Sequence, residues 1–167
     1  MHSLEIQALK PDQWESFKSL RLAALKHDPS SFGKTYAEES ELSNEEWKRK
    51  AMESNSKNDR DTLIAYLDES PVGLIFVFIR EDSNTGAIGG FWVNPNFRRK
   101  GIGKALIQSS MDWLNSKKIK EMNFWNNPNN AASSAFYQKM GFSYIGKKQS
   151  LESDPTQKIQ LMRKELN

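Results

Sequence analysis

Hydrophobic and polar residues follow two different periods along this chain. In several short segments, apolar residues alternate with polar ones or run together between turn residues, a pattern that predicts β-strands. Elsewhere, apolar residues recur three and four positions apart, which is the spacing of one face of an α-helix. We therefore expect strands over residues 4–9, 62–67, 72–80, 85–93, 121–125, 142–148 and 159–164, and helices over residues 11–25, 43–52, 100–114 and 131–140.

Capping and turn residues indicate where some of these elements begin and end. Ser43 and Glu46 have the spacing of a capping box, which opens a helix by satisfying its first backbone N–H groups. Gly141 follows the last predicted helix, where glycine is favoured because it adopts left-handed backbone readily. Residues 30–42 are rich in serine, glycine and glutamate, and we predict a loop there.

The order of the predicted elements defines the fold class. Strands and helices are interleaved along the whole chain, which predicts a mixed α/β fold. The chain has 167 residues, with 37% hydrophobic and 27% charged residues, values typical of a globular protein. We expect a single domain over residues 1–167, because no internal repeat or low-complexity segment divides the chain.

Several classes of protein are disfavoured by what the sequence lacks. The longest apolar run, residues 72–79, has the length of a buried strand and not of a membrane span. The N-terminal MHSLEIQALK shows no signal-peptide pattern, and we expect a cytoplasmic protein that does not bind membranes. The absence of cysteine excludes disulfides, thiolate metal sites and cysteine nucleophiles, and no metal site is expected.

The charges are unevenly distributed, although the net charge is only +3. Residues 97–120 contain seven cations and one acid, whereas residues 28–47 contain six acids and one cation. The chain therefore has one region that attracts anions and one that attracts cations. Two ordinary solvated surfaces would explain the same pattern.

Residues 98–106 contain glycines and cations in a spacing that can be compared with three phosphate-binding patterns. A nucleotide P-loop fails at Arg98 and Ala105, and the dinucleotide-binding pattern fails at Leu106. The third pattern, Arg/Gln-x-x-Gly-x-Gly/Ala after a strand ending in Val-x-Pro, fits residues 93–103. Such a strand-to-helix turn directs backbone N–H groups and the helix dipole at one point, where a pyrophosphate can bind.

Three further features stand near this turn. Gly89 and Gly90 interrupt an apolar strand, which indicates a bulge, a close approach by a ligand along the strand backbone, or core packing alone. Asn130 and Tyr137 bound a short helix. Taken singly, they are predicted to be a helix N-cap and a core aromatic residue.

Taken in order, these motifs resemble the GNAT superfamily of acyl-CoA N-acyltransferases. The matching elements are V-x-P-x-x-R-R-x-G-I-G-x-x-L from Val93, N-x6-Y-x-K-x-G-F from Asn130, and a closing strand that ends in residues 162–166, MRKEL. Residues 20–39, LRLAALKHDPSSFGKTYAEE, also resemble a segment of many small bacterial members.

The resemblance implies a fold and a cofactor site. The fold is a mostly antiparallel sheet, splayed into a V between the strands of residues 85–93 and 121–125, with helices on both faces. The pantetheine arm of acetyl-CoA would lie in this V. Asn130 matches the asparagine that contacts that arm, and Tyr137 matches the tyrosine near the thioester sulfur. The arm would bond the backbone of Phe91, Trp92 and Val93, and the pyrophosphate would bind the amides of Arg98, Arg99, Lys100, Gly101, Ile102, Gly103 and Lys104.

Acetyl transfer within this site would proceed by direct attack of an amine, because no cysteine is present to carry the acetyl group. Tyr137 would protonate the departing thiolate, and strand amides near Trp92 and Val93 would stabilise the oxyanion. Many relatives carry a glutamate on the strand before the turn, but residues 87–92 contain no acid. Glu38 or Glu39 would serve as general base, directly or through water, or would only attract a cationic amine.

Other residues are assigned by position alone. His2 and His27 are remote from every motif, and we expect them to be structural or exposed. Phe32, Tyr36 and Trp47 would line the acceptor pocket or pack in the core.

We therefore expect an acetyl-CoA-dependent N-acetyltransferase that acts on an unidentified, small cationic amine. Acetylation of a protein or peptide amine is the alternative within the same class. A different class would be a non-catalytic acetyl-CoA-binding module, or a nucleic-acid-binding module that uses the basic stretch with Trp113 and Trp125. Acids near the N-terminal end disfavour a polyanion, so no nucleic-acid partner is expected. A homodimer is a further alternative, since dimers are common among members of the superfamily.

Overall fold

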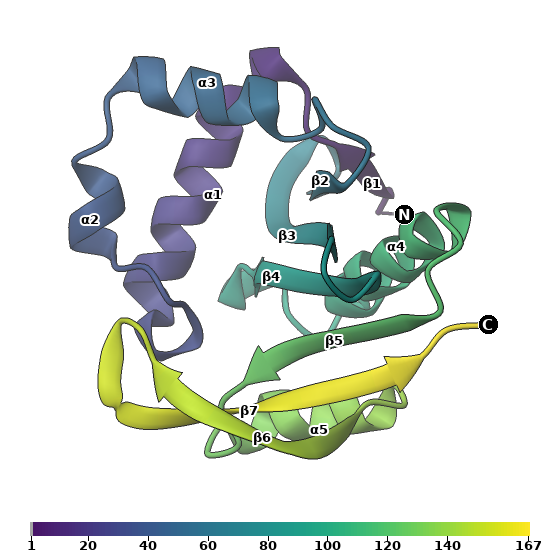
Figure 1. The fold of residues 1–167 in the computed structure, drawn as a ribbon. Coiled ribbons are helices and arrows are strands. Elements are labelled where there is room, and N and C mark those ends of the chain that lie inside the picture. The colour runs from purple at the N-terminus through teal and green to yellow at the C-terminus, as the bar shows by residue number, and fades with distance from the viewer. Residues whose placement is uncertain (1) are drawn as a thin grey trace.

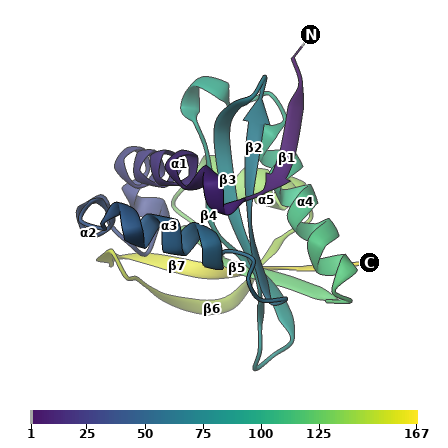
Figure 2. The same cartoon turned by 90° about the horizontal axis from the view of Figure 1, so that it is seen from above.

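The computed structural model describes residues 2–167. Figure 1 shows a central sheet with helices around it, and Figure 2 shows α1 and α3 on one side of the sheet and α4 on the other. The elements are β1 (Leu4–Ala8), η1 (Pro11–Gln13), α1 (Trp14–His27), η2 (Pro29–Ser31), α2 (Tyr36–Ser40), α3 (Asn44–Glu53), β2 (Arg60–Leu67), β3 (Ser70–Arg80), β4 (Thr85–Val93), η3 (Pro95–Phe97), α4 (Ile102–Ser116), β5 (Glu121–Asn126), α5 (Ala131–Lys139), β6 (Ser143–Leu151) and β7 (Asp154–Glu165).

The described strands form one seven-stranded sheet in the order β1-β2-β3-β4-β5-β7-β6. Every neighbouring pair is antiparallel except β4 and β5, which run parallel. A parallel pair requires a crossover connection, and here the crossover is α4, whose apolar stripe packs on the sheet. The predicted mixed α/β fold with a mostly antiparallel sheet is therefore confirmed.

The two parallel strands separate soon after they begin. They pair only where Gly86 lies opposite Met122 and Ala87 lies opposite Asn123. Beyond Ala87, no residue of β4 has a partner on β5 within the described chain, and the strands diverge toward their carboxyl ends (Figure 1). The predicted V is confirmed, and one edge of β4 beyond Ala87 lacks a neighbouring strand.

A bulge in β4 accompanies this separation. Gly89 pairs with Phe76 and Trp92 pairs with Leu74, so two residues of β4 lie opposite the single residue between them on β3. Gly90 in the bulge has φ 58°, and a Cβ atom there would lie 2.5 Å from the Phe76 ring. The glycine pair therefore marks a bulge, and the close approach at Gly90 is made by a core aromatic residue.

Each face of the sheet has its own hydrophobic core, as expected for helices on both faces. One core joins α4 and α5 to the sheet and includes Leu106, Leu114 and Tyr137. The other joins α1 and α3 to the opposite face and includes Phe17 and Trp47. Because each face is covered, strands such as β3 are apolar over several consecutive residues.

The predicted elements are all present, but several boundaries differ from the sequence-based expectation. The predicted helix of residues 11–25 is divided into η1 and α1, and β7 begins at Asp154 and not at residue 159. The predicted loop of residues 30–42 contains η2 and α2, the latter begun by a capping box between Thr35 and Glu38. Its five residues are too few to show a helical period, which is why the pattern did not predict it. In addition, α4 begins at Ile102 and not at Lys100, because Arg99 and Gly101 have left-handed backbone.

Within residues 2–167, none of the helices is long and apolar enough to cross a bilayer. In the same part of the chain, no three histidine or acidic side chains come together where they would hold a metal ion.

Candidate active site

The turn from β4 to α4 lies at the end of the unpaired part of β4. Arg99 has φ 62° and Gly101, the N-cap of α4, has φ 79°. Gly101 has no side chain that could cap the helix, so the N-cap residue provides no side-chain acceptor for the first backbone N–H groups of α4. No atom lies within 4 Å of the position that a Cβ atom of Gly101 would occupy. The turn therefore leaves open space directly beside backbone donors.

The four cations of this turn fall into two groups. Arg99, Lys100 and Lys104 are exposed, and none of them forms an ion pair within the part of the chain that the structure describes. Arg98 instead donates from Nε to the Val93 carbonyl at 2.8 Å and from Nη2 to Asp28 at 2.9 Å. Its guanidinium is bonded to protein, which the sequence pattern did not predict.

The next two residues of the motif have packing roles. Ile102 is 1% exposed and belongs to the core beneath α4. A Cβ atom on Gly103 would lie 3.2 Å from Cζ of Phe91, so this glycine allows α4 to approach β4 closely. Of the two motif glycines, only Gly101 stands beside open space.

The end of β4 presents its side chains to opposite faces of the sheet. Phe91 and Val93 pack with the core of α4, whereas Trp92, 4% exposed, packs with the core of α1. The backbone of these residues lies in the part of β4 that has no β5 partner. A ligand could bond this edge as an added strand would, except at the Val93 carbonyl, which already accepts from Arg98.

Tyr137 on α5 contacts both arms of the V. Its ring centroid lies 4.5 Å from that of Phe124 on β5 and 6.1 Å from that of Phe91 on β4. The Tyr137 side chain is 7% exposed. Burial raises the pKa of Tyr137 well above its ordinary value, with a smaller contribution from Tyr144, so the hydroxyl is protonated at neutral pH.

Asn130 has the N-cap role that its position alone predicted. Its Oδ1 accepts from the backbone N–H of Ser133 at 3.1 Å, and its side chain is exposed at the start of α5. Beside it lies a polar network that the sequence did not reveal, in which Asn126, Ser134 and the Tyr144 hydroxyl are joined by hydrogen bonds. Asn126 is the last residue of β5, Ser134 lies on α5 and Tyr144 lies on β6.

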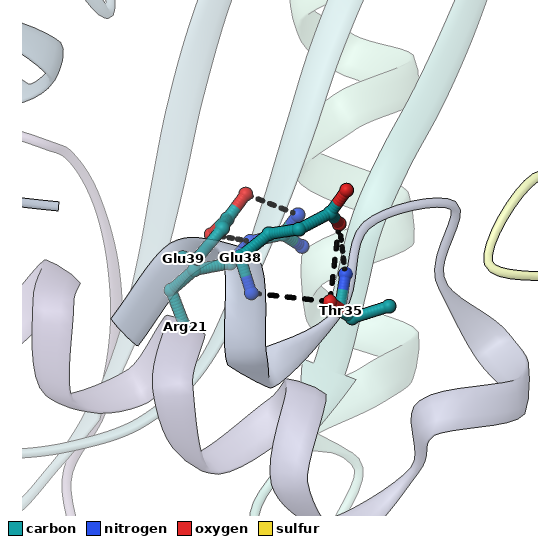
Figure 3. A network of polar contacts seen from close by, with 4 residues as sticks. All are labelled: Arg21, Thr35, Glu38 and Glu39. Atoms are coloured by element: carbon teal, nitrogen blue, oxygen red, sulfur yellow. Dashed lines mark hydrogen bonds and ion pairs between the residues drawn. The ribbon is translucent and has the colours of Figure 1, made fainter. Parts of the chain in front are cut away.

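The two acids predicted as general-base candidates both have partners within the protein (Figure 3). Glu38 accepts from the backbone N–H of Thr35 at 2.8 Å and from its hydroxyl at 3.1 Å. These hydrogen bonds, the backbone one first, lower the pKa of Glu38 and make it a weaker base. Glu39 accepts two hydrogen bonds from Arg21, at 2.9 and 3.1 Å.

The pair of Arg21 and Glu39 is part of the core packing. Their side chains are 9% and 12% exposed, and the guanidinium lies 5.4 Å from the ring centroids of both Phe32 and Phe76. Phe32 and Trp47 are themselves buried, as the core-packing alternative predicted, whereas Tyr36 is 41% exposed. This arrangement anchors α2 to α1.

Two neighbouring residues at the end of α1 were missed by the sequence analysis. His27 was expected to be remote from every motif, but its ring stacks on that of Trp92 with centroids 6.2 Å apart and planes at 21°. Asp28 accepts a hydrogen bond from Trp92 Nε1 at 2.7 Å. His27 is exposed, as expected, but it is not remote from the motifs, because the intervening chain returns β4 to the end of α1.

Comparison with known proteins supports this geometry. Residues 14–142 match the model of the acetyltransferase (GNAT) family. The aminoglycoside N(6')-acetyltransferase type 1 of Salmonella typhimurium is 31% identical over 88 residues, which cover 48% of this chain and 61% of that protein. The chain thus spans less than two thirds of this relative.

Solved structures resemble the whole chain. The crystal structure of a GNAT-family acetyltransferase from Streptococcus pneumoniae has a TM-score of 0.82 at 19% identity, covering 99% of this chain and 100% of that one. The structure of RimL, a ribosomal L7/L12 alpha-N-protein acetyltransferase in complex with coenzyme A, has a TM-score of 0.80 at 16% identity and covers 98% and 94%. Because the family model matches most of the sequence, the chain belongs to the GNAT family of acetyltransferases.

Proposed function

We propose that this chain transfers the acetyl group of acetyl-CoA directly to a primary amine of a small cationic acceptor. The observation that carries the proposal is the divergence of β4 from β5 directly before the open turn at Gly101. One strand thereby offers an unpaired backbone edge and then a set of free backbone donors. An elongated ligand with an anionic end fits that sequence of groups.

The cofactor is proposed to follow β4 from the bulge to the turn. Its pantetheine arm bonds the backbone of Phe91, Trp92 and Val93, and its pyrophosphate binds the amides from Arg99 to Lys104. The amide of Arg98, expected to join them, donates instead to the Pro95 carbonyl at 3.4 Å. Exposed cations at Arg99, Lys100 and Lys104 and the empty space beside Gly101 suit a doubly charged group. The amide nitrogen of Asn130 remains as a donor to the arm, since its oxygen caps α5.

The proposed chemistry requires one side chain at the reacting atoms. The neutral amine attacks the thioester carbonyl carbon, and strand amides near Trp92 and Val93 stabilise the oxyanion, which contributes about 3 kcal/mol in other enzymes. Collapse of the intermediate breaks the C–S bond, and the Tyr137 hydroxyl gives its proton to the thiolate. The amine nitrogen releases its proton to water, and water restores that of the tyrosine.

The raised pKa of Tyr137 is compatible with this role. Burial disfavours every negative charge nearby, so it raises the proton affinity of a thiolate formed beside Phe91 and Phe124 as well as that of the phenol. In this proposal, the Tyr137 hydroxyl donates to a ligand in the V.

Glu38 is proposed to act at a distance, by attracting a cationic amine, because its low pKa disfavours proton abstraction. Glu39 is proposed to hold α2 against α1 through its hydrogen bonds with Arg21. Since these were the two candidate bases, the amine is proposed to lose its proton through water.

The acidic segment of residues 28–47 supports a cationic acceptor. The printed name of the Salmonella relative, an aminoglycoside acetyltransferase, points the same way. Transfer to a protein N-terminus is the alternative, favoured by the similarity to the RimL structure.

The test is release of CoA thiol from acetyl-CoA in the presence of a panel of amines. The panel contains an aminoglycoside, a polyamine and a peptide with a free N-terminus. Release with either of the first two supports the proposal, and release with the peptide alone supports the alternative. If no amine causes thiol release and the protein binds a single-stranded oligonucleotide with a steep salt dependence, the nucleic-acid alternative replaces both.

A further inference from the structure

The carboxylate of Asp28, at the C-terminal end of α1, accepts two hydrogen bonds from the cofactor side of the molecule. Its Oδ2 atom accepts from Trp92 Nε1 at 2.7 Å and from Arg98 Nη2 at 2.9 Å. Trp92 is the second-last residue of β4, and Arg98 begins the turn into α4. One oxygen atom of Asp28, the residue that follows α1, thus binds both the end of β4 and the start of the turn into α4.

A third hydrogen bond completes the connection. Nε of Arg98 donates to the carbonyl of Val93 at 2.8 Å, so Arg98 links Asp28 to the last residue of β4. The Trp92 ring is buried between this network and the ring of His27. Together these contacts support the end of β4 on the side where it has no β5 partner, whereas β3 pairs with Trp92 and Val93 on the other side.

We propose that Asp28 is a positioning residue, which acts through Trp92 and Arg98 to hold the end of β4 in the conformation that receives the cofactor arm. Arg98, on this account, serves the arm and not the pyrophosphate, because Asp28 neutralises its charge and Val93 takes its Nε–H. The cations left for the pyrophosphate are Arg99, Lys100 and Lys104. The inference rests on the proposed function, since it assumes that acetyl-CoA lies along β4.

Two probes separate an effect on the arm from an effect on the phosphates. Acetyl-CoA contains both groups, whereas S-acetylpantetheine has the arm and no pyrophosphate. Dissociation constants for both are measured by calorimetry, directly or by competition, with wild-type protein and with Asp28→Ala, Asp28→Asn, Arg98→Ala and Arg99→Ala. Circular dichroism establishes that each variant is folded at the temperature used.

Asp28→Ala and Arg98→Ala are expected to weaken both probes by the same factor, about tenfold, because each removes hydrogen bonds that fix β4. Asp28→Asn recovers part of the affinity, since its amide oxygen still accepts from the indole. The double variant Asp28→Ala/Arg98→Ala binds about as well as the weaker single variant, because the two residues act as a unit. Arg99→Ala weakens acetyl-CoA alone.

Two results overturn the inference while wild-type protein binds both probes. One is an Asp28→Ala variant that binds both probes as tightly as wild-type protein does. If Asp28→Ala does not fold, the same result in Asp28→Asn and Arg98→Ala takes its place. The other is an Arg98→Ala variant that loses affinity for acetyl-CoA but not for S-acetylpantetheine, which would make Arg98 a phosphate ligand. Wild-type protein that binds neither probe overturns the proposed function and this inference together.

Discussion

The β4–α4 turn and the segment between α1 and α3 are held in place by different kinds of contact. The turn is shaped by its own backbone, with left-handed conformations at Arg99 and Gly101 and a tight approach of Gly103 to Phe91. The α1–α3 segment is held by side chains from distant parts of the sequence. Arg21 binds Glu39, and Phe32 accepts a hydrogen bond from Ser153 in the β6–β7 connection at 2.5 Å.

This difference explains how one site can combine a constant part with a variable part. Backbone donors recognise a phosphate without depending on most side chains, so the turn suits one ligand class. The α1–α3 segment meets the β6–β7 connection through an exposed ion pair between Lys34 and Glu152, at 3.5 Å, in addition to the Ser153 contact. Substitutions at the contacts of Lys34 with Glu152 and of Ser153 with Phe32 would change the shape of the α1–α3 segment and leave the β4–α4 turn unaltered.

The largest expected effect on stability separates the two regions. Arg21→Ala leaves Glu39 mostly buried without its partner, and the free energy of unfolding should fall by about 3 kcal/mol in urea denaturation. The affinity for acetyl-CoA should not change, because the turn does not depend on this pair. In the control Arg21→Met/Glu39→Leu, most of the stability should return. A matching loss of acetyl-CoA affinity in Arg21→Ala would show that the cofactor strand depends on this pair as well as on Asp28.

Tyr137→Phe should have the largest effect on catalysis. The aromatic packing is kept but the proton donor is lost, so kcat with an accepted amine should fall about 100-fold. The dissociation constant of acetyl-CoA should stay the same. Steady-state kinetics beside calorimetry tests this, with Tyr144→Phe as a control on the neighbouring hydroxyl. Equal kcat in Tyr137→Phe and wild-type protein would remove Tyr137 from the mechanism.

Gly90→Ala should disturb the cofactor strand itself. A Cβ atom at the left-handed Gly90 meets the Phe76 ring, which should lower the free energy of unfolding by about 2 kcal/mol. Gly146→Ala on β6 is the matched control, since no atom lies within 4 Å of its Cβ position. Unlike Arg21→Ala, the Gly90 variant should also weaken acetyl-CoA binding, because the bulge shapes the unpaired edge of β4. Normal affinity in a folded Gly90→Ala protein would argue that the bulge has only a packing role.

The smallest expected effect is a dependence of the free energy of unfolding on pH, caused by Glu38 on α2. Because the pKa of Glu38 is lowered by its hydrogen bonds to Thr35, its ionised form stabilises the folded state above the unfolded pKa. This contribution is lost as the pH falls through the lower folded pKa. Glu38→Gln keeps an acceptor for the cap but removes the charge, so it should be slightly less stable than wild-type protein at pH 7. Urea denaturation at a series of falling pH values should show the difference in stability shrinking, and a difference that does not change with pH would assign the effect to something other than charge.

The same contrast decides what the sequence could predict. The strands, the long helices, the Gly101 turn and the N-cap of Asn130 depend on nearby residues, and their patterns identified them. The contacts of Arg98 with Asp28 and of His27 with Trp92 join residues more than 60 positions apart, and no local pattern contains them. Glu39 illustrates the limit, because its sequence context resembles that of Glu38 but its partner, Arg21, lies on another helix.

The central claim is that the Gly101 turn binds the pyrophosphate of acetyl-CoA. Calorimetric titration of acetyl-CoA into wild-type protein, Gly101→Glu and Gly146→Glu tests it directly. Both variants add one negative charge at a glycine with open space around its Cβ position, but only the first lies in the turn, where the added side chain also stands on left-handed backbone. The account predicts equal affinity for wild-type protein and Gly146→Glu, and a loss of about 100-fold or more for Gly101→Glu. Undiminished affinity in a folded Gly101→Glu protein would contradict it.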